Sequence, residues 1–302
     1  MQFRKAAPES GFGNAVKVHR MTTARQNHSE PAAVLDAEAM LALLEPLTTL
    51  VAEAGAAICA IRRGTLTVDE KSDGSPVTQA DLAADRIIAE GLARLCPGVR
   101  TLSEERTGDV QSAFDGSFFL IDPLDGTKEF IAGRDEFTVN LAIVTGGVPM
   151  LGIVGAPALG LIWRGIVGHG AQRIVLGDAT SPRTVEPIHT RPHPPAGSPW
   201  NVAVSRSHGD PRTEAFIAQR PHACRRVLGS AVKFGHVADG EVDIYPRLSP
   251  TSEWDVGAGH ALVVAAGGKV TDSQGRPLRF GTSRDSFIVP EFIAWGDASA
   301  MP

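Results

Sequence analysis

The sequence predicts a layered α/β fold, and three observations carry this prediction. Apolar residues recur at helical spacing over residues 44–63 and 78–95, a period that indicates helices packed on a core. Between residues 137 and 175, four apolar runs are joined by tight glycine turns, which predicts an antiparallel meander. From residue 201 onward, strand-like and helical segments alternate. Mixed elements of this kind pack as layers of sheet and helix.

Length and charge restrict the architecture and the partners. The chain has 302 residues, of which 43% are hydrophobic, so it can form one large domain or two closely packed ones. The formal charge of -5 gives no general attraction to nucleic acid or to anionic lipid. We therefore expect no nucleic-acid partner, and any phosphorylated small molecule must be held locally by cations, backbone N–H groups or metal ions.

Cysteine usage and hydropathy indicate a cytoplasmic protein. Cys59, Cys96 and Cys224 lie far apart in sequence and are odd in number, which favours a reducing compartment. No apolar run is expected to approach the roughly 20 residues that span a bilayer, so we predict no transmembrane segment. A weak association with the cytoplasmic face of the inner membrane stays open, and so does the oligomeric state.

The first elements have clear boundaries in the sequence. In the helix predicted over 44–63, Pro46 is tolerated in the first turn and Gly64 suits a C-cap. An alternating run at 65–68 predicts a short strand, and residues 72–76 predict a loop.

The second helix is expected to begin at a capping box. Thr78 is followed three residues later by Asp81, and Pro97 with Gly98 ends the helix after Leu95. Asp81 therefore belongs to a first helical turn.

The remaining elements follow from the same rules. Apolar strands are predicted over 99–102 and 117–121, each ending in acidic residues. The meander consists of strands over 137–145, 148–156, 160–167 and 171–175. In the second half we expect strands over 201–205, 242–245 and 269–271, a helix from Pro211, and helices over 230–239 and 253–266.

The predicted domain organisation has two folded parts. Residues 1–34 are polar and basic without periodicity, which predicts a disordered extension; a transit peptide or a true start at Met21 are alternatives. An N-terminal α+β subdomain over 35–177 is followed by a Pro-, Thr- and Ser-rich loop over 178–200. A C-terminal α/β subdomain over 201–296 and a tail over 297–302 complete the chain.

The strongest chemical signal lies where an apolar strand ends in two carboxylates. Asp122 and Asp125 are three residues apart, and crowded carboxylates repel one another unless a cation is present. Gly126 permits a tight backbone, so the N–H groups of Gly126 and Thr127 can form an anion cradle at a helix start. Hard oxygen ligands suit Mg²⁺. For this pair alone, an ordinary helix N-cap aspartate is the alternative.

Further acids fall at matching places in the pattern. Glu104 and Glu105 end the preceding strand, so Glu104 can reach the same point as Asp122 if the two strands are neighbours. Asp255 follows Trp254 at the start of the last long helix, where an aspartate otherwise serves only as a partner of the helix dipole. A solvated strand end is the alternative for the two glutamates.

Together these motifs resemble the inositol monophosphatase superfamily, whose pattern is an acidic pair, D-P-[LI]-D-G-T and W-D, in this order. The resemblance runs from about residue 40 to 295. It implies an αβαβα sandwich like that of fructose-1,6-bisphosphatase, and a magnesium-dependent phosphomonoesterase. The segment T-K-E-F at 127–130 is similar to the 3′(2′),5′-bisphosphate nucleotidase branch, since inositol phosphatases usually have Asn before the Phe. Similar segments recur at 205–208, 229–234, 245–247 and 254–260.

The resemblance implies a role for each matching residue. Metal ions, two or three of them, would be held by Glu104, Asp122, Asp125, Asp255 and the Leu124 carbonyl, with Asp122 bridging two Mg²⁺. Thr127 and Asp81 would orient the attacking water and accept its proton. The nucleotide would be contacted by Ser205, His208, Gly229 and Lys233, in addition to the cradle at Gly126 and Thr127. Lys233 also has a physical argument, because a second phosphate needs a cation on an acidic protein.

The implied reaction is hydrolysis of adenosine 3′,5′-bisphosphate to AMP and phosphate, in sulfur assimilation or nucleotide recycling, with inhibition by lithium. Two alternatives are kept. One is an inositol monophosphatase or broad sugar phosphatase. The other is a non-catalytic protein that binds a phosphorylated metabolite, although a binder has no need to gather this many acids at an electrostatic cost.

Overall fold

The computed structural model describes residues 33–64, 68–70, 76–109, 114–177, 183–207, 209–220, 222–282 and 287–301. Apart from its last two residues, the predicted extension over 1–34 lies outside the described residues. The same holds for nearly all of the loop predicted at 72–76. Of the strand predicted at 65–68, only Val68 is described, and it begins strand β1.

The first half of the chain supplies two long helices and one large sheet. Its elements are α1 (Ala37–Arg62), β1 (Val68–Glu70), β2 (Pro76–Thr78), α2 (Gln79–Leu95), β3 (Arg100–Ser103), η1 (Glu104–Asp109), β4 (Ser117–Asp125), α3 (Thr127–Ile131), β5 (Thr138–Thr145), β6 (Val148–Ala156), η2 (Pro157–Leu159), β7 (Leu161–Ile166), β8 (Gly170–Val175) and β9 (Thr184–Ile188).

The second half supplies a smaller sheet and three helices. Its elements are β10 (Asn201–Ser205), α4 (Pro211–Ala218), β11 (Cys224–Leu228), α5 (Val232–Ala238), β12 (Ile244–Arg247), β13 (Thr251–Ser252), α6 (Glu253–Ala265), β14 (Lys269–Thr271), β15 (Ile288–Val289), β16 (Phe292–Trp295) and η3 (Ala298–Ala300).

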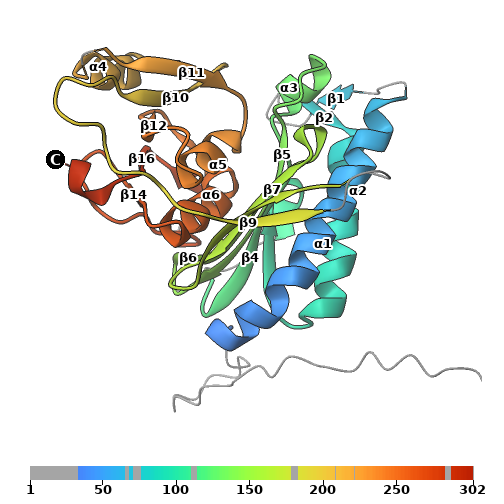
Figure 1. Ribbon diagram of the computed structural model, residues 1–302. Coiled ribbons are helices and arrows are strands. Elements are labelled where there is room, and N and C mark those ends of the chain that lie inside the picture. Colours follow the sequence, from blue (N-terminus) through green and yellow to red (C-terminus); the bar gives the residue numbers. More distant parts are fainter. Residues whose placement is uncertain are drawn as a thin grey trace, which may run out of the picture.

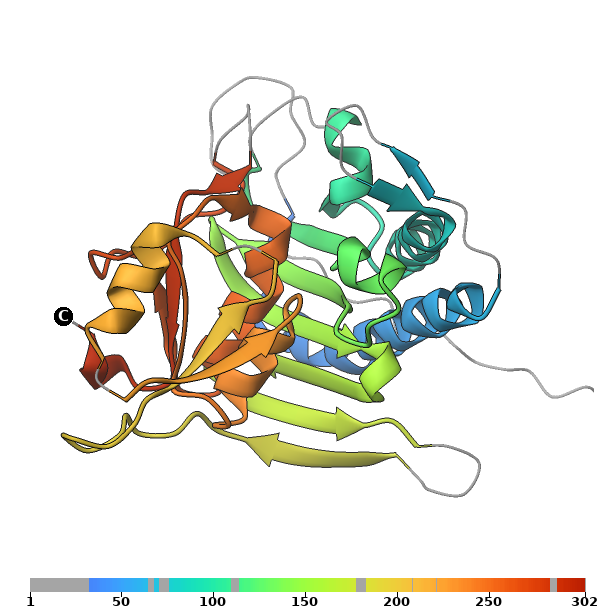
Figure 2. The same cartoon turned by 90° about the horizontal axis from the view of Figure 1, so that it is seen from above.

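These elements form five layers (Figure 1 and Figure 2). Helices α1 and α2 pack on one face of the sheet β3-β4-β5-β6-β7-β8-β9, through an apolar cluster that includes Leu47, Ile58 and Ile121. Helices α5 and α6 lie between this sheet and the sheet β11-β10-β12-β16-β14. Helix α4 packs through Ile217 on the far face of the second sheet. The predicted αβαβα sandwich is confirmed.

Several predicted elements are confirmed with shifted ends. The meander β5 to β8 is antiparallel throughout. Helix α1 begins at Ala37, earlier than predicted, because Asp36 is an N-cap whose carboxylate accepts a hydrogen bond from the Ala39 N–H at 2.9 Å. The predicted capping box of α2 is present, with Thr78 and Asp81 in their expected places.

The loop predicted over 178–200 is wrong in part. Residues 184–188 form β9, which pairs antiparallel with β8 and extends the large sheet beyond the predicted boundary at 177. The proline in this strand, Pro187, obscured it in the sequence. Because β9 is the last strand of the sheet, a residue without an N–H is tolerated there.

Helix α1 also corrects the hydropathy analysis. Within the described residues it is the one helix long and apolar enough to cross a membrane, judged by length and composition alone. Its inner side chains, such as Leu43, Leu47 and Val51, are buried against α2 and the large sheet. The structure therefore uses α1 as a core helix.

One packing contact fixes the separation of α6 from the large sheet. Gly152 lies in β6, and a Cβ built there would come within 2.1 Å of the Ala258 carbonyl oxygen in α6.

We expect Gly152→Ala to lower the free energy of unfolding by about 1–3 kcal/mol or more, as overpacking does in a close-packed core. Urea denaturation measures this loss.

Gly209→Ala is the matched control, because no described atom lies within 4 Å of its added Cβ. Its free energy of unfolding should stay within about 0.5 kcal/mol of the parent value. Equal effects of the two substitutions would contradict the packing assignment.

Candidate active site

Two neighbouring strands bring the first carboxylates together. Strands β3 and β4 pair in parallel, with Ser103 opposite Ile121, so the next residues, Glu104 and Asp122, begin at the same edge of the sheet. The sequence prediction that these strands are neighbours is confirmed. Both acids line one pocket.

An irregularity in β4 lets the carboxylates of Asp122 and Asp125 face the same point. Residues three apart on a regular strand face opposite sides. The pairing of β4 with β5 shifts register between Asp122 and Asp125, and such a bulge re-aims side chains. Carboxylate oxygens of Asp122, Asp125 and Asp255 lie within 4.8 Å of one another.

Asp255 is placed by the start of α6. Its carboxylate accepts hydrogen bonds from the Thr251 hydroxyl and, at 3.1 Å, from the Ser252 N–H. A helix N-terminus also favours a negative charge. Asp255 thus occupies the helix start, where the sequence left the role of a dipole partner as the alternative, and it also lies beside Asp122 and Asp125.

The pocket measures about 690 Å³ and is built by both halves of the chain. The first half contributes Glu104, Asp122, Asp125 and the turn from Leu124 to Glu129, and the second half contributes Asp255, Ser205, Ser230, Lys233 and Arg247. Glu104, Asp122, Asp125 and Asp255 form an acidic cluster, which shares the pocket with cationic side chains.

Ionisation of the acidic cluster is electrostatically unfavourable without a cation. Burial raises the pKa of Asp122 well above its ordinary value, and repulsion from Glu104, Asp125 and Asp255 adds to the effect. Burial, with repulsion from Asp125, raises the pKa of Asp255 to about 6. A divalent cation removes the repulsion and keeps the groups ionised. The all-oxygen donor set, with the Leu124 carbonyl adjacent, fits Mg²⁺.

Thr127 and Asp81 are in contact, as the sequence predicted. The Thr127 hydroxyl lies 3.2 Å from Asp81 Oδ1 and 3.2 Å from the Leu124 carbonyl oxygen. The other oxygen of Asp81 accepts bonds from the Thr78 N–H and hydroxyl, at 2.8 and 2.6 Å. Burial raises the pKa of Asp81, which makes its carboxylate a better proton acceptor near neutral pH.

The predicted nucleotide contacts have mixed positions. Ser205 and Lys233 line the pocket, and Gly126 takes the left-handed backbone conformation, φ 87°, that its turn requires. His208 lies outside the described residues. Gly229 is not among the lining residues; its N–H donates to Glu136 at 3.1 Å.

Gly229 is required for packing in the structure. A Cβ there would come within 2.7 Å of the Glu136 carbonyl oxygen and 2.9 Å of Glu129 Cγ. The close approach of two backbones explains the glycine without any contact to a ligand.

Sequence reasoning missed two residues of the pocket. Ser230, at φ 50°, donates its hydroxyl to Asp125 Oδ2 at 2.7 Å and so holds a predicted metal ligand 105 positions away. Arg247 carries an Nε that is buried and has no hydrogen-bond partner among the described residues. Both belong to segments noted for their resemblance, but no local pattern marks a contact across so long a separation.

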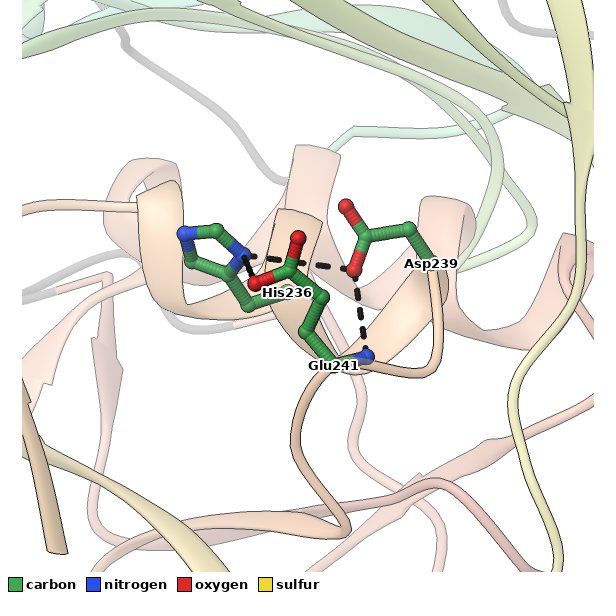
Figure 3. Close-up of side chains that lie close together, drawn as sticks. All are labelled: His236, Asp239 and Glu241. Atoms are coloured by element: carbon green, nitrogen blue, oxygen red, sulfur yellow. Dashed lines mark hydrogen bonds and ion pairs between the residues drawn. The ribbon is translucent and has the colours of Figure 1, made fainter.

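A second group of potential metal ligands lies outside the pocket (Figure 3). His236 Nδ1 lies 3.1 Å from Glu241 Oε2 and 3.9 Å from Asp239 Oδ1. The carboxylate of Glu241 already has a cationic partner, and the carboxylate of Asp239 already accepts a hydrogen bond. Arg226 binds Glu241 at 2.6 Å, and the Trp163 ring N–H donates to Asp239 at 3.1 Å. The charges of this cluster are compensated without an ion.

Fold and site together define a layered α/β protein with a polar pocket, in which Asp122, Asp125 and Asp255 could hold a metal ion. The chain matches the inositol monophosphatase family over residues 40–294 and belongs to that family.

Curated relatives and solved structures agree with this assignment. The 3′(2′),5′-bisphosphate nucleotidase CysQ of Escherichia coli is 38% identical over 261 residues, covering 83% of this chain and 98% of that protein. CysQ of Buchnera aphidicola is 34% identical over 257 residues, covering 83% and 93%. The crystal structure of CysQ from Bacteroides thetaiotaomicron superposes with a TM-score of 0.63 at 32% identity, covering 83% of this chain and 96% of that one. An inositol monophosphatase structure from Anabaena gives a TM-score of 0.63 at 25% identity, covering 85% and 91%.

Metal removal should change stability in a pH-dependent way. The raised pKa values of Asp122 and Asp255 mean that the metal-free folded chain holds protons there that the unfolded chain releases. The stability that these bound protons give to the metal-free folded chain is fully present below about pH 4. It is lost as the pH rises through about 6 at Asp255, and at higher pH for Asp122.

Magnesium should therefore raise the melting temperature more at about pH 7.5 than at about pH 5, by on the order of 5 °C at saturation, because ions compete with protons at low pH. Differential scanning calorimetry in EDTA and in Mg²⁺ measures the effect. Asp255→Asn is the control and should lose the part of the pH dependence that comes from Asp255, while the part from Asp122 remains. The same rise at both pH values would contradict the assignment.

Proposed function

We propose that this chain is a magnesium-dependent phosphomonoesterase of the CysQ type, which hydrolyses adenosine 3′,5′-bisphosphate to AMP and phosphate. The observation that carries the proposal is that the carboxylates of Asp122, Asp125 and Asp255 line one pocket together with the cationic side chains of Lys233 and Arg247. The identity with curated 3′(2′),5′-bisphosphate nucleotidases, over almost their whole length, supports it.

In this proposal the metal ligands are the carboxylates of the acidic cluster and the Leu124 carbonyl. Glu104, Asp122 and the Leu124 carbonyl would hold one Mg²⁺, and Asp122, Asp125 and Asp255 a second. When bound, such ions lower the pKa of a water molecule and neutralise charge on the phosphate and on the leaving oxygen.

The chain's own residues then handle the proton. The water oxygen attacks phosphorus, the bond from phosphorus to the 3′-oxygen breaks, and the water proton moves by way of the Thr127 hydroxyl to Asp81. Two observations support this role: the 3.2 Å contact between Thr127 and Asp81, and the raised pKa of the Asp81 carboxylate. The leaving 3′-oxygen takes a proton from solvent.

Lys233 and Arg247 account for the second phosphate of the substrate. Lys233 is only 2% exposed, and its Nζ lies 3.3 Å from the Leu228 carbonyl oxygen and 5.1 Å from the Tyr245 ring centroid. A buried ammonium with few partners binds an anion strongly, because solvent does not screen it. Arg247 offers the planar donor set that matches phosphate oxygens.

A substrate panel tests the proposal. Phosphate release in Mg²⁺ should be faster by about a hundredfold or more in kcat/KM for adenosine 3′,5′-bisphosphate than for inositol 1-phosphate, since one desolvated ionic contact is worth about 1.5–3 kcal/mol and two are available. EDTA should abolish both rates. Equal rates, or a preference for inositol 1-phosphate, would favour an inositol or sugar phosphatase. Binding of the nucleotide without turnover would favour a non-catalytic protein.

The pH dependence of nucleotide recognition should follow Lys233. Burial lowers the pKa of Lys233 to about 8, so its charge is lost as the pH rises through that value. For the bisphosphate, kcat/KM should then fall by about tenfold per pH unit above about pH 8. Inositol 1-phosphate, which lacks the second phosphate, should show a smaller fall.

Lys233→Met removes the charge while keeping an unbranched side chain of similar size. It should lower kcat/KM for the bisphosphate at neutral pH by about 10–100-fold and remove the additional fall at high pH. A Lys233→Met enzyme with the parent pH profile would assign the fall to another group.

A further inference from the structure

A buried carboxylate that the proposed reaction does not use connects the two halves of the chain. Glu129, in α3, is 5% exposed and lines the pocket. Its Oε1 accepts a hydrogen bond from the Ser207 hydroxyl at 2.8 Å, across 78 positions of sequence. Ser207 follows β10, whose last residue, Ser205, forms part of the pocket wall.

A second carboxylate strengthens the same junction. Glu136 accepts hydrogen bonds from the Arg206 guanidinium and from the Gly229 N–H, the latter at 3.1 Å. Gly229 packs so closely on Glu129 and Glu136 that a Cβ would not fit. The segment from Glu129 to Glu136 therefore holds two parts of the second half, the turn after β10 and the turn before α5.

This junction sets the distance between two parts of the pocket. Glu129 lies two residues after Thr127, whose hydroxyl contacts Asp81. Ser207 lies two residues after Ser205, which lines the same pocket. In the proposed function, a small alcohol phosphate needs only the acidic cluster, whereas a nucleotide would also contact Ser205 and Lys233.

We propose that Glu129 is a positioning residue for nucleotide selectivity, which acts by holding Ser207 and with it the turn Ser205–Ser207. This inference rests on the proposed function, because it concerns how that pocket selects a nucleotide. The side-chain length at position 129 is essential to it: an Asn, one methylene shorter, would leave the Ser207 hydroxyl beyond hydrogen-bond distance. The Glu in the T-K-E-F segment then has a physical explanation.

A double-mutant cycle tests the inference. The measured quantity is the selectivity, the ratio of kcat/KM for adenosine 3′,5′-bisphosphate to kcat/KM for inositol 1-phosphate. Glu129→Ala and Ser207→Ala should each lower this ratio by about tenfold, mainly through KM for the nucleotide, as expected for loss of a hydrogen bond to a charged group. The double variant should lower the ratio no further than the single variants, since both remove one contact.

Two controls separate positioning from general damage. Glu129→Gln keeps an oxygen that accepts from Ser207, so it should restore the ratio to within about threefold of the parent value. Glu186→Ala removes a carboxylate from the exposed pair with Arg173 on the edge strand β9 and should leave the ratio unchanged.

Each result decides the inference. Additive losses in the double variant, or equal losses on both substrates, would overturn it while leaving the proposed function intact. A parent enzyme that prefers inositol 1-phosphate would overturn the proposed function first, and the selectivity role with it. A ratio that falls in Glu129→Ala and is restored in Glu129→Gln supports the positioning role.

Discussion

Repulsion among carboxylates is the constraint on which the structure of the site depends. Burial raises the pKa of Asp122 well above its ordinary value, and repulsion from Glu104, Asp125 and Asp255 raises it further. The fold imposes this crowding by parallel pairing of β3 with β4, by the irregularity in β4, and by the start of α6. In the ionised state such crowding is costly unless a cation compensates the charges, and this cost is the physical basis of the proposed magnesium site.

The two halves of the chain contribute different properties to one cavity. The first half supplies most of the acidic cluster and the Thr127–Asp81 pair, where a phosphate ester can be hydrolysed, and α6 of the second half adds Asp255. The second half supplies Lys233, Arg247 and the wall at Ser205, where a larger substrate can be recognised. Their junction at Glu129 and Glu136 is polar, specific and long in sequence separation. Selectivity can therefore change at this junction without a change in the hydrolytic groups.

Local patterns in the sequence placed Glu104 and Asp122 at the ends of apolar strands, and Asp81 and Asp255 in first helical turns. That these acids act together in one site came from the resemblance to the inositol monophosphatase superfamily. Other features arise only from tertiary structure. The strand β9 was hidden by Pro187, and the partners Ser230 and Ser207 lie 105 and 78 positions from the acids they bind. Gly229 was predicted to touch the nucleotide, but the structure explains it by backbone packing.

Anomalous diffraction from crystals soaked in Mn²⁺ would show whether the acidic cluster binds divalent ions, because this ion substitutes for Mg²⁺ at oxygen sites and is located without reference to activity. We expect peaks among Glu104, Asp122, Asp125 and Asp255, and loss of those peaks in Asp122→Asn. Ordered carboxylates with no peak between them, or a peak confined to the cluster of His236, Asp239 and Glu241, would contradict this expectation.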